Sequence, residues 1–170
     1  MNLRPLTQSD DLALSIFLDS EFSKAATYQT VLKLRKTNMV AMERLAFEGT
    51  KIVGYLCCAK MVNPSDWWVL SVLVVSSSHR KKGIGRELVY RGMNHARREK
   101  APAVVVVGDP SYFAHVGFSK AAAENLVLPF AQDYTSLYPI APGTGLSRHE
   151  LVYPDAFLPV GDVTTSPASA

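Results

Sequence analysis

Apolar and polar positions at the start of the chain predict one strand followed by two helices. Residues 2–6 can form a short first strand, and a polar break follows it. Ser9 or Asp10 can then cap a helix that continues to about Phe22. Three apolar residues recur at helical spacing on one face of this helix: Leu12, Ile16 and Phe17. A second helix is predicted over residues 28–36.

Three strand-like runs come next, separated by turn residues. They cover residues 39–48, 51–61 and 67–75. The turn Glu48-Gly49-Thr50 joins the first two runs and is typical of a hairpin. Neighbours joined by short turns run antiparallel, so the three runs predict an antiparallel meander.

An amphipathic helix and a continuous β-branched run follow the meander. Residues 85–100 carry apolar side chains at helical spacing, and Pro102 ends this helix. Val104–Val107 is typical of a strand that is buried on both faces. A strand, a helix and a second strand form a crossover, so Val104–Val107 should lie parallel to Leu70–Val75.

The last third of the chain predicts a short helix and further strands. Asp109-Pro110 is a typical helix start, and Gly117 fits a left-handed helix end. Residues 125–130 and 150–160 are expected to supply the last strands of the sheet.

Composition fits one domain and limits its partners. The chain has 170 residues, of which 48% are hydrophobic, so residues 1–160 can form a single domain with its own core. Residues 161–170 are small and polar, and we expect a flexible tail there. Cys57 and Cys58 are neighbours that point to opposite faces of a strand, which excludes a disulfide between them.

Charge and hydropathy argue against nucleic-acid and membrane partners. A net charge of +3 is mild and suits an anionic ligand. Nucleic-acid binding would favour aromatic residues among the cations, and the basic cluster from Arg80 to Arg86 contains none. No run approaches the ~20 apolar residues of a membrane span, and the N-terminus lacks an apolar signal core. We therefore expect a cytoplasmic protein with no nucleic-acid or membrane partner and no metal.

The basic segment His79–Leu88 carries the strongest chemical signal in the chain. It connects an apolar strand to an amphipathic helix and contains two glycines and three consecutive cations. A helix start offers unsatisfied N–H groups and a partial positive charge, and glycines let a phosphate approach the backbone. The segment therefore predicts a pyrophosphate site. It matches no Walker loop, and a dinucleotide fold would need a glycine at Leu88. A basic loop whose glycines only permit a turn stays open.

The spacing Arg-x-x-Gly-x-Gly at residues 80–85 resembles the acetyl-coenzyme A (acetyl-CoA) signature of the GNAT superfamily of N-acetyltransferases. Leu73-Val74-Val75 stands where the family has Leu-x-Val, and Gly117-Phe118 stands where a short helix of the family ends in Gly-Phe. Gly108–Phe113 and Leu151–Phe157 are similar to the YhbS-type branch of predicted acetyltransferases.

The resemblance implies an α/β (α+β) fold: a mixed, mostly antiparallel sheet with a splayed parallel pair of strands and flanking helices. It implies transfer of the acetyl group of acetyl-CoA to a primary amine of a small molecule or peptide, by direct attack of the neutral amine. The pantetheine arm of the cofactor would lie between the splayed strands. The residues expected to bind the cofactor are Leu73, Val74, Val75, Arg80, Lys81, Lys82, Gly83, Ile84, Gly85 and Phe113.

Tyr112 is the catalytic residue that we expect to protonate the leaving thiolate. The family often has a tyrosine four residues before the glycine of Gly-Phe, where this chain has Phe113, which cannot donate a proton. Phe113 would instead pack against the thiol end of the cofactor. Tyr112 faces about 100° away around the helix, so another residue or water stays open as the donor. Its hydroxyl could also simply complete a hydrogen bond.

No general base is singled out by the sequence. Three carboxylates are candidates by position only, and each also suits a solvated surface charge: Glu21, Glu43 and Glu48. Relay through ordered water is equally consistent with the pattern.

The acceptor pocket is expected between the first two helices and a loop at residues 131–145, and the acceptor amine stays unnamed. Phe113 also keeps open a non-catalytic acyl-CoA-binding sensor or regulatory module, and the basic loop keeps open a nucleotide-binding domain. The sequence does not decide whether the chain forms a homodimer.

Overall fold

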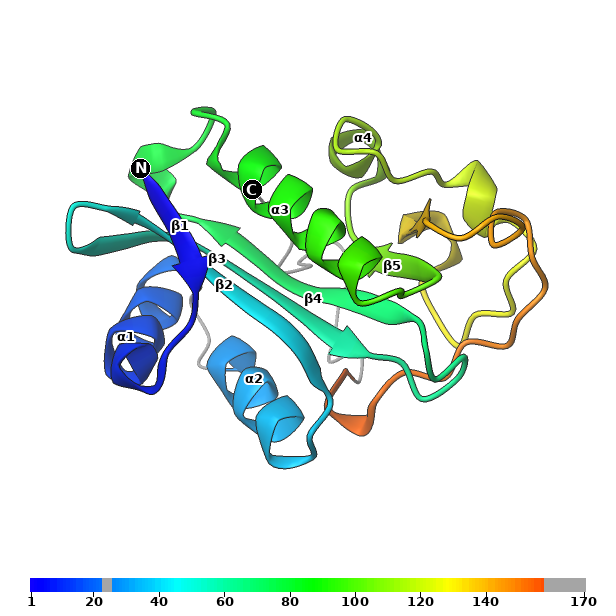
Figure 1. The fold of residues 1–170 in the computed structure, drawn as a ribbon, viewed down its shortest axis with the longest axis horizontal. Coiled ribbons are helices and arrows are strands. Elements are labelled where there is room, and N and C mark those ends of the chain that lie inside the picture. Colours follow the sequence, from blue (N-terminus) through cyan, green and yellow to red (C-terminus); the bar gives the residue numbers. More distant parts are fainter. Residues whose placement is uncertain (23–25, 158–170) are drawn as a thin grey trace.

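A single six-stranded sheet, covered by helices on both faces, forms the centre of the molecule (Figure 1). The computed structural model describes residues 1–22 and 26–157. The strands lie side by side in chain order: β1 Asn2–Pro5, β2 Val40–Glu48, β3 Lys51–Lys60, β4 Trp68–Val75, β5 Ala103–Val107 and β6 Thr135–Pro139. The helices are α1 Asp11–Glu21, α2 Ala26–Lys36, α3 Ile84–Arg98 and α4 Pro110–Ala114.

The predicted meander and crossover are both confirmed. Strands β1 to β4 pair antiparallel, each with the next, and β5 and β6 also pair antiparallel. Between them, β4 and β5 pair in parallel, with α3 as the crossover helix. The parallel pairing is short, because it joins only Trp68–Leu70 to Val104–Val106.

The last strand differs from the prediction. Strand β6 lies inside residues 131–145, where a loop was expected, and it covers the outer edge of β5. Its polar residues are buried, and Thr135 is satisfied because its hydroxyl donates to the Ala131 carbonyl at 2.8 Å. Residues 125–130 and 150–157 form only isolated bridges, such as Val127 with Glu150. Residues 158–160 and the predicted tail at 161–170 lie outside the described residues.

Helix α1 is rotated relative to the predicted face. Its buried residues are Leu14, Phe17 and Leu18, whereas Leu12 and Ile16 are 73% and 62% exposed. The observed stripe has the i, i+3, i+4 spacing of a core-facing helix, so the helix was correct and its phase was wrong.

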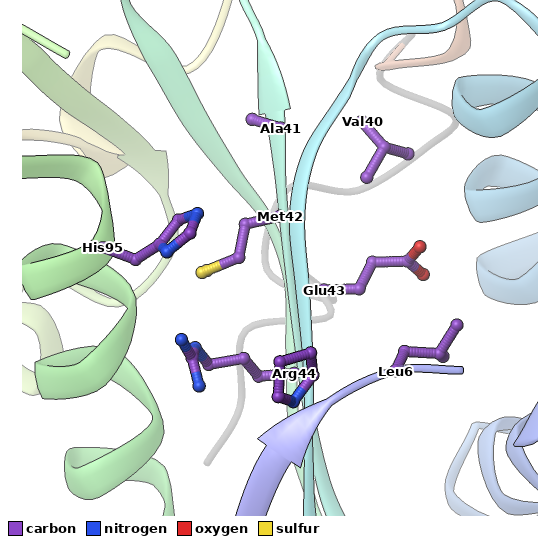
Figure 2. A pocket seen from close by; sticks show the side chains of 8 residues that line it. Leu6, Val40, Ala41, Met42, Glu43, Arg44 and His95 are labelled. Atoms are coloured by element: carbon purple, nitrogen blue, oxygen red, sulfur yellow. The ribbon is translucent and has the colours of Figure 1, made fainter. Parts of the chain in front are cut away.

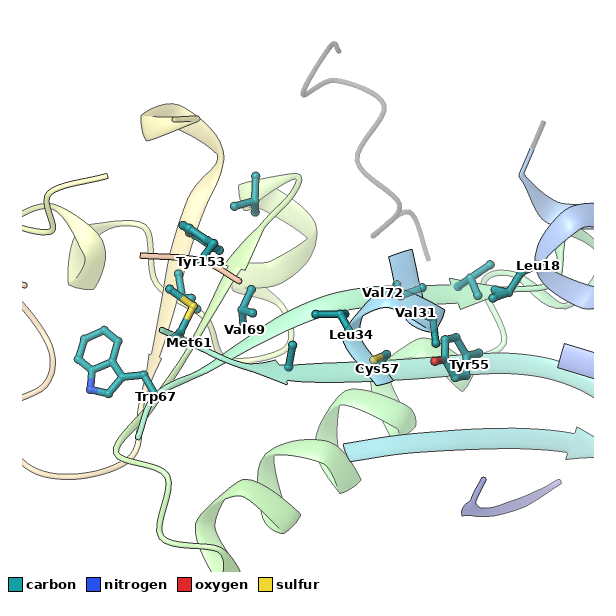
Figure 3. Close-up of a cluster of buried hydrophobic side chains, with 14 of the residues drawn as sticks. Leu18, Val31, Leu34, Tyr55, Cys57, Met61, Trp67, Val69, Val72 and Tyr153 are labelled. Atoms are coloured by element: carbon teal, nitrogen blue, oxygen red, sulfur yellow. The ribbon is translucent and has the colours of Figure 1, made fainter. Parts of the chain in front are cut away.

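The sheet divides the core into two clusters. One cluster packs against α1 and α2 and includes Cys57 and Trp67 (Figure 3), and the other packs against α3 and α4 and includes Cys58 and Trp68. Neighbouring residues of a strand thus enter opposite cores, as predicted for the cysteines. Both cysteines are free and fully buried, and burial raises the pKa of Cys57 to about 12. Both tryptophans are buried.

The described residues contain neither a membrane-spanning helix nor a cluster of metal-binding side chains. None of their helices is long and apolar enough to cross a membrane. No group of three or more His, Cys, Asp or Glu side chains among these residues could hold a metal ion.

A paired carboxylate joins the edge strand to the first helix. Asp10 occupies the N-cap position of α1 but makes no capping hydrogen bond to the helix; its carboxylate instead accepts two hydrogen bonds from the Arg4 guanidinium of β1, at 2.7 and 2.8 Å. The backbone N–H and the hydroxyl of Thr7 also donate to it, at 2.8 and 2.7 Å. These bonds hold the pKa of the Asp10 carboxyl well below its usual range.

This depressed pKa makes the contribution of Asp10 to stability depend on pH. A carboxyl with a lowered pKa in the folded state stabilises the fold above its unfolded pKa of ~3.9, and the stabilisation is lost as pH falls through the folded pKa. We expect Asp10→Asn to lower the urea midpoint at pH 7, and the difference from the wild type to shrink below about pH 4. Asp19→Asn, an exposed position of α1, is the control. A constant difference from pH 7 to pH 3 would contradict this prediction.

Candidate functional site

Strands β4 and β5 separate at a β-bulge in β4. Cys57 pairs with Val72 and Cys58 pairs with Leu70, so Ser71 is the extra residue. The parallel pairing with β5 ends at Leu70, one residue before the bulge. A bulge bends its strand and increases the local twist, which carries the second half of β4 away from β5. The Ser71 hydroxyl donates to the Cys57 carbonyl at 3.1 Å, so this buried polar side chain is satisfied.

Beyond the bulge, successive residues of β4 direct their backbone N–H and C=O groups alternately toward β3 and toward β5. The Ser76 N–H donates to the Val53 carbonyl of β3 at 2.9 Å, which sets the phase of the alternation. Val74 therefore directs its N–H and C=O toward β3, while Leu73 and Val75 direct theirs toward β5. No strand of the described residues pairs with β4 at these two positions. The side chains of Leu73, Val74 and Val75 are buried in the core, as expected.

The segment after β4 enters α3 through two left-handed residues. Lys81 has a φ of 62° and Gly83, the N-cap of α3, has a φ of 80°. The first helical bond runs from the Glu87 N–H to the Gly83 carbonyl at 3.0 Å. Within the described chain, the N–H groups from Lys82 to Arg86 have no acceptor, as is usual for a helix start. A Cβ on Gly83 would meet no atom within 4 Å, so the backbone is open to solvent there.

The predicted cations of this loop differ in orientation. Lys81 and Lys82 are exposed beside the helix start. Arg80 instead turns back toward the strand, and its Nε donates to the Val75 carbonyl at 3.4 Å. Ile84 and Gly85 begin the helix and are buried against the sheet.

Two of the three candidate carboxylates fasten this loop to the rest of the fold. Glu21, at the end of α1, accepts the Ser77 N–H at 2.9 Å, and its side chain is only 10% exposed. It also lies 4.0 Å from the Arg80 guanidinium. Glu48 lies 2.8 Å from Nε2 of His79, and this contact lowers the pKa of Glu48. Glu21 is therefore an anchor of the loop and not the solvated charge that the sequence suggested.

Glu43 belongs to a partly buried polar network on the α1/α2 face of the sheet. It accepts hydrogen bonds from the Arg35 guanidinium at 2.7 Å and from the Tyr55 hydroxyl at 2.6 Å. Arg35 also donates to Asp11 at 2.8 Å, which ties α2 to α1. Glu43 is thus a structural partner of Arg35, and the sequence analysis missed this role.

The short helix α4 brings Tyr112 and Phe113 against the core cluster of α3. The Tyr112 hydroxyl is buried without a hydrogen-bond partner in the described chain, and burial raises its pKa. Phe113 is fully buried, with its ring 5.1 Å from Tyr112 and 5.5 Å from Phe118 in edge-to-face contacts. A ligand can therefore reach Phe113 only if its neighbours move. Asp109 caps the helix by accepting the Ser111 N–H at 2.9 Å, as predicted.

The residues expected around the acceptor lie on different faces. Tyr134 packs against the core cluster of α1 and α2. Tyr138, on β6, turns to the α3 face, where its hydroxyl accepts a hydrogen bond from Arg97. Asp133 is exposed and lies 3.4 Å from Lys120. Strand β6 thus divides what was expected to be one loop.

Residues 10–118 match the family model of the acetyltransferase (GNAT) family. The chain belongs to this family. It is 27% identical over 121 residues to the uncharacterized N-acetyltransferase YhbS of Escherichia coli K12, which covers 69% of this chain and 72% of that protein.

Two solved structures share the GNAT fold with this chain. YhbS of Escherichia coli in complex with CoA has a TM-score of 0.82 and 23% identity, over 92% of this chain and 91% of that one. A GNAT acetyltransferase of Brucella melitensis in complex with acetyl-CoA has a TM-score of 0.76 and 18% identity, over 92% and 97%. The predicted fold class is therefore confirmed.

The sequence analysis missed the bulge at Ser71 and the anchoring role of Glu21, which it considered only as a candidate base. Ser71 is the one polar residue within Val69–Val75, and a lone hydroxyl in a buried strand is a usable signal for a bulge. Glu21 gives no such signal, because its partner Ser77 lies 56 residues away in the chain.

The contact between Glu21 and Ser77 predicts a local effect on the loop. Glu21→Ala removes the acceptor of the Ser77 N–H, so hydrogen exchange at this amide should become about 10-fold faster. Amides in the middle of α3 should keep their protection, because their acceptors lie within the helix. Asp19→Ala, on the exposed side of α1, is the matched control. Equal exchange at Ser77 in both variants would show that Glu21 does not hold the loop.

Proposed function

We propose that the chain transfers the acetyl group of acetyl-CoA to a primary amine of a small molecule or peptide. The observation that carries this proposal is the succession along the chain of two sets of backbone groups without a backbone partner, those of β4 beyond the bulge and those at the start of α3. A cofactor with an amide-bearing arm and a pyrophosphate fits this pair, because the arm needs strand-like partners and the pyrophosphate needs clustered N–H donors.

In this proposal the loop holds the pyrophosphate. The N–H groups from Lys82 to Arg86, including those of Gly83, Ile84 and Gly85, donate to the phosphate oxygens, and Lys81 and Lys82 add positive charge. Arg80 supplies a further charge-assisted contact once it leaves the Val75 carbonyl.

Strand β4 binds the pantetheine arm and assists the reaction. The backbone groups of Leu73 and Val75 pair with the amides of the arm, and Val74 keeps the strand attached to β3. The neutral amine attacks the acetyl carbonyl, and a backbone N–H of β4 stabilises the negative charge that develops on the carbonyl oxygen. Phe113 packs near the thiol end after its neighbours move.

Tyr112 supplies the proton for the departing thiolate in this mechanism. Its buried hydroxyl has a raised pKa and stays protonated at neutral pH, as a proton donor must. The amine loses its proton to water, because Glu21, Glu43 and Glu48 each have a structural partner.

One observation favours a second candidate, a non-catalytic acyl-CoA-binding module. Phe113 stands where the family often has a tyrosine, so the site lacks the usual proton donor at that position. Thermal-shift titrations with acetyl-CoA, CoA, ATP and NAD distinguish the enzyme and the acyl-CoA-binding module from a nucleotide-binding domain. Each ligand raises the melting temperature only of a native protein that binds it. Thiol release over a panel of amines then separates the enzyme from the module.

The glycines of the loop predict a loss of cofactor affinity. In Gly83→Val a side chain occupies the approach of the phosphate, and in Gly85→Val a side chain at a buried position displaces the first turn of α3, so CoA should bind roughly 100-fold more weakly or worse in each. Arg80→Ala removes one contact among several and should cost less, on the order of 1–3 kcal/mol. Isothermal titration with CoA measures each change.

A matched control removes the effect of backbone strain. Gly143 has a φ of 82°, and a Cβ there also meets no atom within 4 Å, so Gly143→Val reproduces the strain of Gly83→Val away from the loop. Folded Gly83 and Gly85 variants that bind CoA like the wild type would refute the phosphate loop.

The proton donor predicts a change in turnover at constant affinity. Tyr112→Phe removes only the hydroxyl and should lower kcat by ~10²-fold or more, with little change in CoA affinity. Phe113→Tyr restores a phenol at the family's position and should raise the rate. Unchanged turnover in Tyr112→Phe would assign the proton to solvent. No reaction in any form over the amine panel would favour the binding module.

A further inference from the structure

A groove of about 310 Å³ opens at the free edge of β2 (Figure 2). It exists because β1 pairs only with Arg44–Phe47, so the first half of β2 has no strand of the described chain on its outer side. His95 of α3 lines the groove, and it lies twelve residues beyond Gly83, or about 18 Å along the helix. The groove is therefore separate from the glycine loop.

One wall of the groove carries unpaired positive charge. Arg44 and His95 point to the same side of β2 as Met42, whereas Glu43 points to the opposite side (Figure 2). The Arg44 Nε is buried and has no hydrogen-bond partner in the described chain, and Arg44 forms no ion pair with a described residue. Glu43 does not neutralise Arg44, because Arg35 and Tyr55 already bind its carboxylate.

Further cations of α3 surround Arg44. Burial and the charges of Arg98 and Arg91 lower the pKa of Arg44. Burial, Arg44 and Arg98 likewise lower the pKa of His95, and Glu99 opposes this shift only in part. Arg91 is bound to Glu87 at 2.7 Å, but Arg44 and Arg98 have no carboxylate partner among the described residues.

We infer that this groove binds a small anionic molecule through a carboxylate or phosphate group held by Arg44 and His95, which line it, with the positive charge of Arg98 beside His95. The buried Nε of Arg44 has no acceptor, and an anion bound to the remaining guanidinium nitrogens would compensate the incompletely solvated charge with matching geometry. The Met42 side chain lies on the same side of β2 as Arg44 and His95 and can contact the remainder of the ligand, whereas Leu6 and Val40 line the opposite side (Figure 2). The volume lies at the lower end of the range of small-molecule sites, ~300–1,000 Å³.

The same charges argue against a second copy of the chain at this edge. Pairing of two β2 edges about a two-fold axis would bring two sets of arginines together without acids between them. A free strand edge can also accept a peptide strand, and the experiment tests this alternative directly.

Trp68 provides a local readout for the groove. Its ring centroid lies 6.0 Å from that of His95, and it is buried beside Met42 in the same core cluster. The protein is labelled with 5-fluorotryptophan, and Trp68→Phe assigns the two fluorine resonances. Inorganic phosphate and citrate are then titrated separately at constant ionic strength, and the pKa of His95 is followed by proton NMR.

We expect a saturable shift of the Trp68 resonance and a rise in the pKa of His95, because a bound anion favours the imidazolium. Arg44→Gln and Arg98→Gln should each weaken the anion at least ~10-fold. Lys36→Gln removes an exposed charge of α2 and should change nothing. Gly83→Val should keep the shift, which separates this groove from phosphate bound at the glycine loop.

Three results would overturn the inference. The first is the absence of saturation by either anion up to roughly 10 mM, where a Kd of ~1 mM would already saturate. The second is an equal response in the wild type and both arginine variants. The third is a response only to an acidic peptide, which would make the edge of β2 a strand-addition site.

Discussion

The extra residue at Ser71 is the constraint on which the site depends. A sheet normally satisfies the backbone groups of a central strand on both sides. The bulge releases β4 from β5 after Leu70, so Leu73 and Val75 keep unpaired groups in the middle of an otherwise continuous sheet. The cost of this opening is limited, because the Ser71 hydroxyl bonds to Cys57 and the Arg80 guanidinium covers the Val75 carbonyl. The strand is thus held ready for an extended partner without a change of fold.

The position of α3 depends on two glycines that let it approach the sheet closely. A Cβ at Gly54 of β3 would lie 2.9 Å from the Leu88 side chain, and one at Gly92 would lie 2.6 Å from the Leu56 side chain. Because both contacts exclude a larger residue, the axis of α3 is fixed against β3 and its first turn lies beside the end of β4. Glu21 then holds the connecting loop from the far face of the sheet.

Local patterns in the sequence predicted the parts of this structure that local interactions determine. The meander, the crossover helix and the glycine loop each have a continuous signature within a short stretch, and the structure has all three as elements. Strand β6 was missed because its buried residues Thr135 and Ser136 are polar, so the segment lacks the apolar pattern of a buried strand. The roles of Glu21 and Glu43 depend on partners from other elements, so no spacing within the sequence could reveal them. The phase of α1 failed for a related reason, since Leu12 and Leu14 are equally apolar and only packing distinguishes them.

Helix α3 has opposite electrostatic conditions at its two ends, and this difference determines how each end can bind an anion. At the N-terminus the helix dipole and the free N–H groups favour negative charge, so the backbone alone can hold a phosphate. At the C-terminus the dipole favours cations, which stabilises Arg97 and Arg98 there but opposes an anion. An anion in the groove must therefore be held by side chains, and the helix cannot supply enough of them alone. Arg44 comes from β2, outside the helix, and its burial keeps its charge incompletely screened by water. The groove thus depends on the edge of β2 that β1 leaves uncovered. In the same way, the proposed cofactor site depends on the part of β4 with which β5 does not pair.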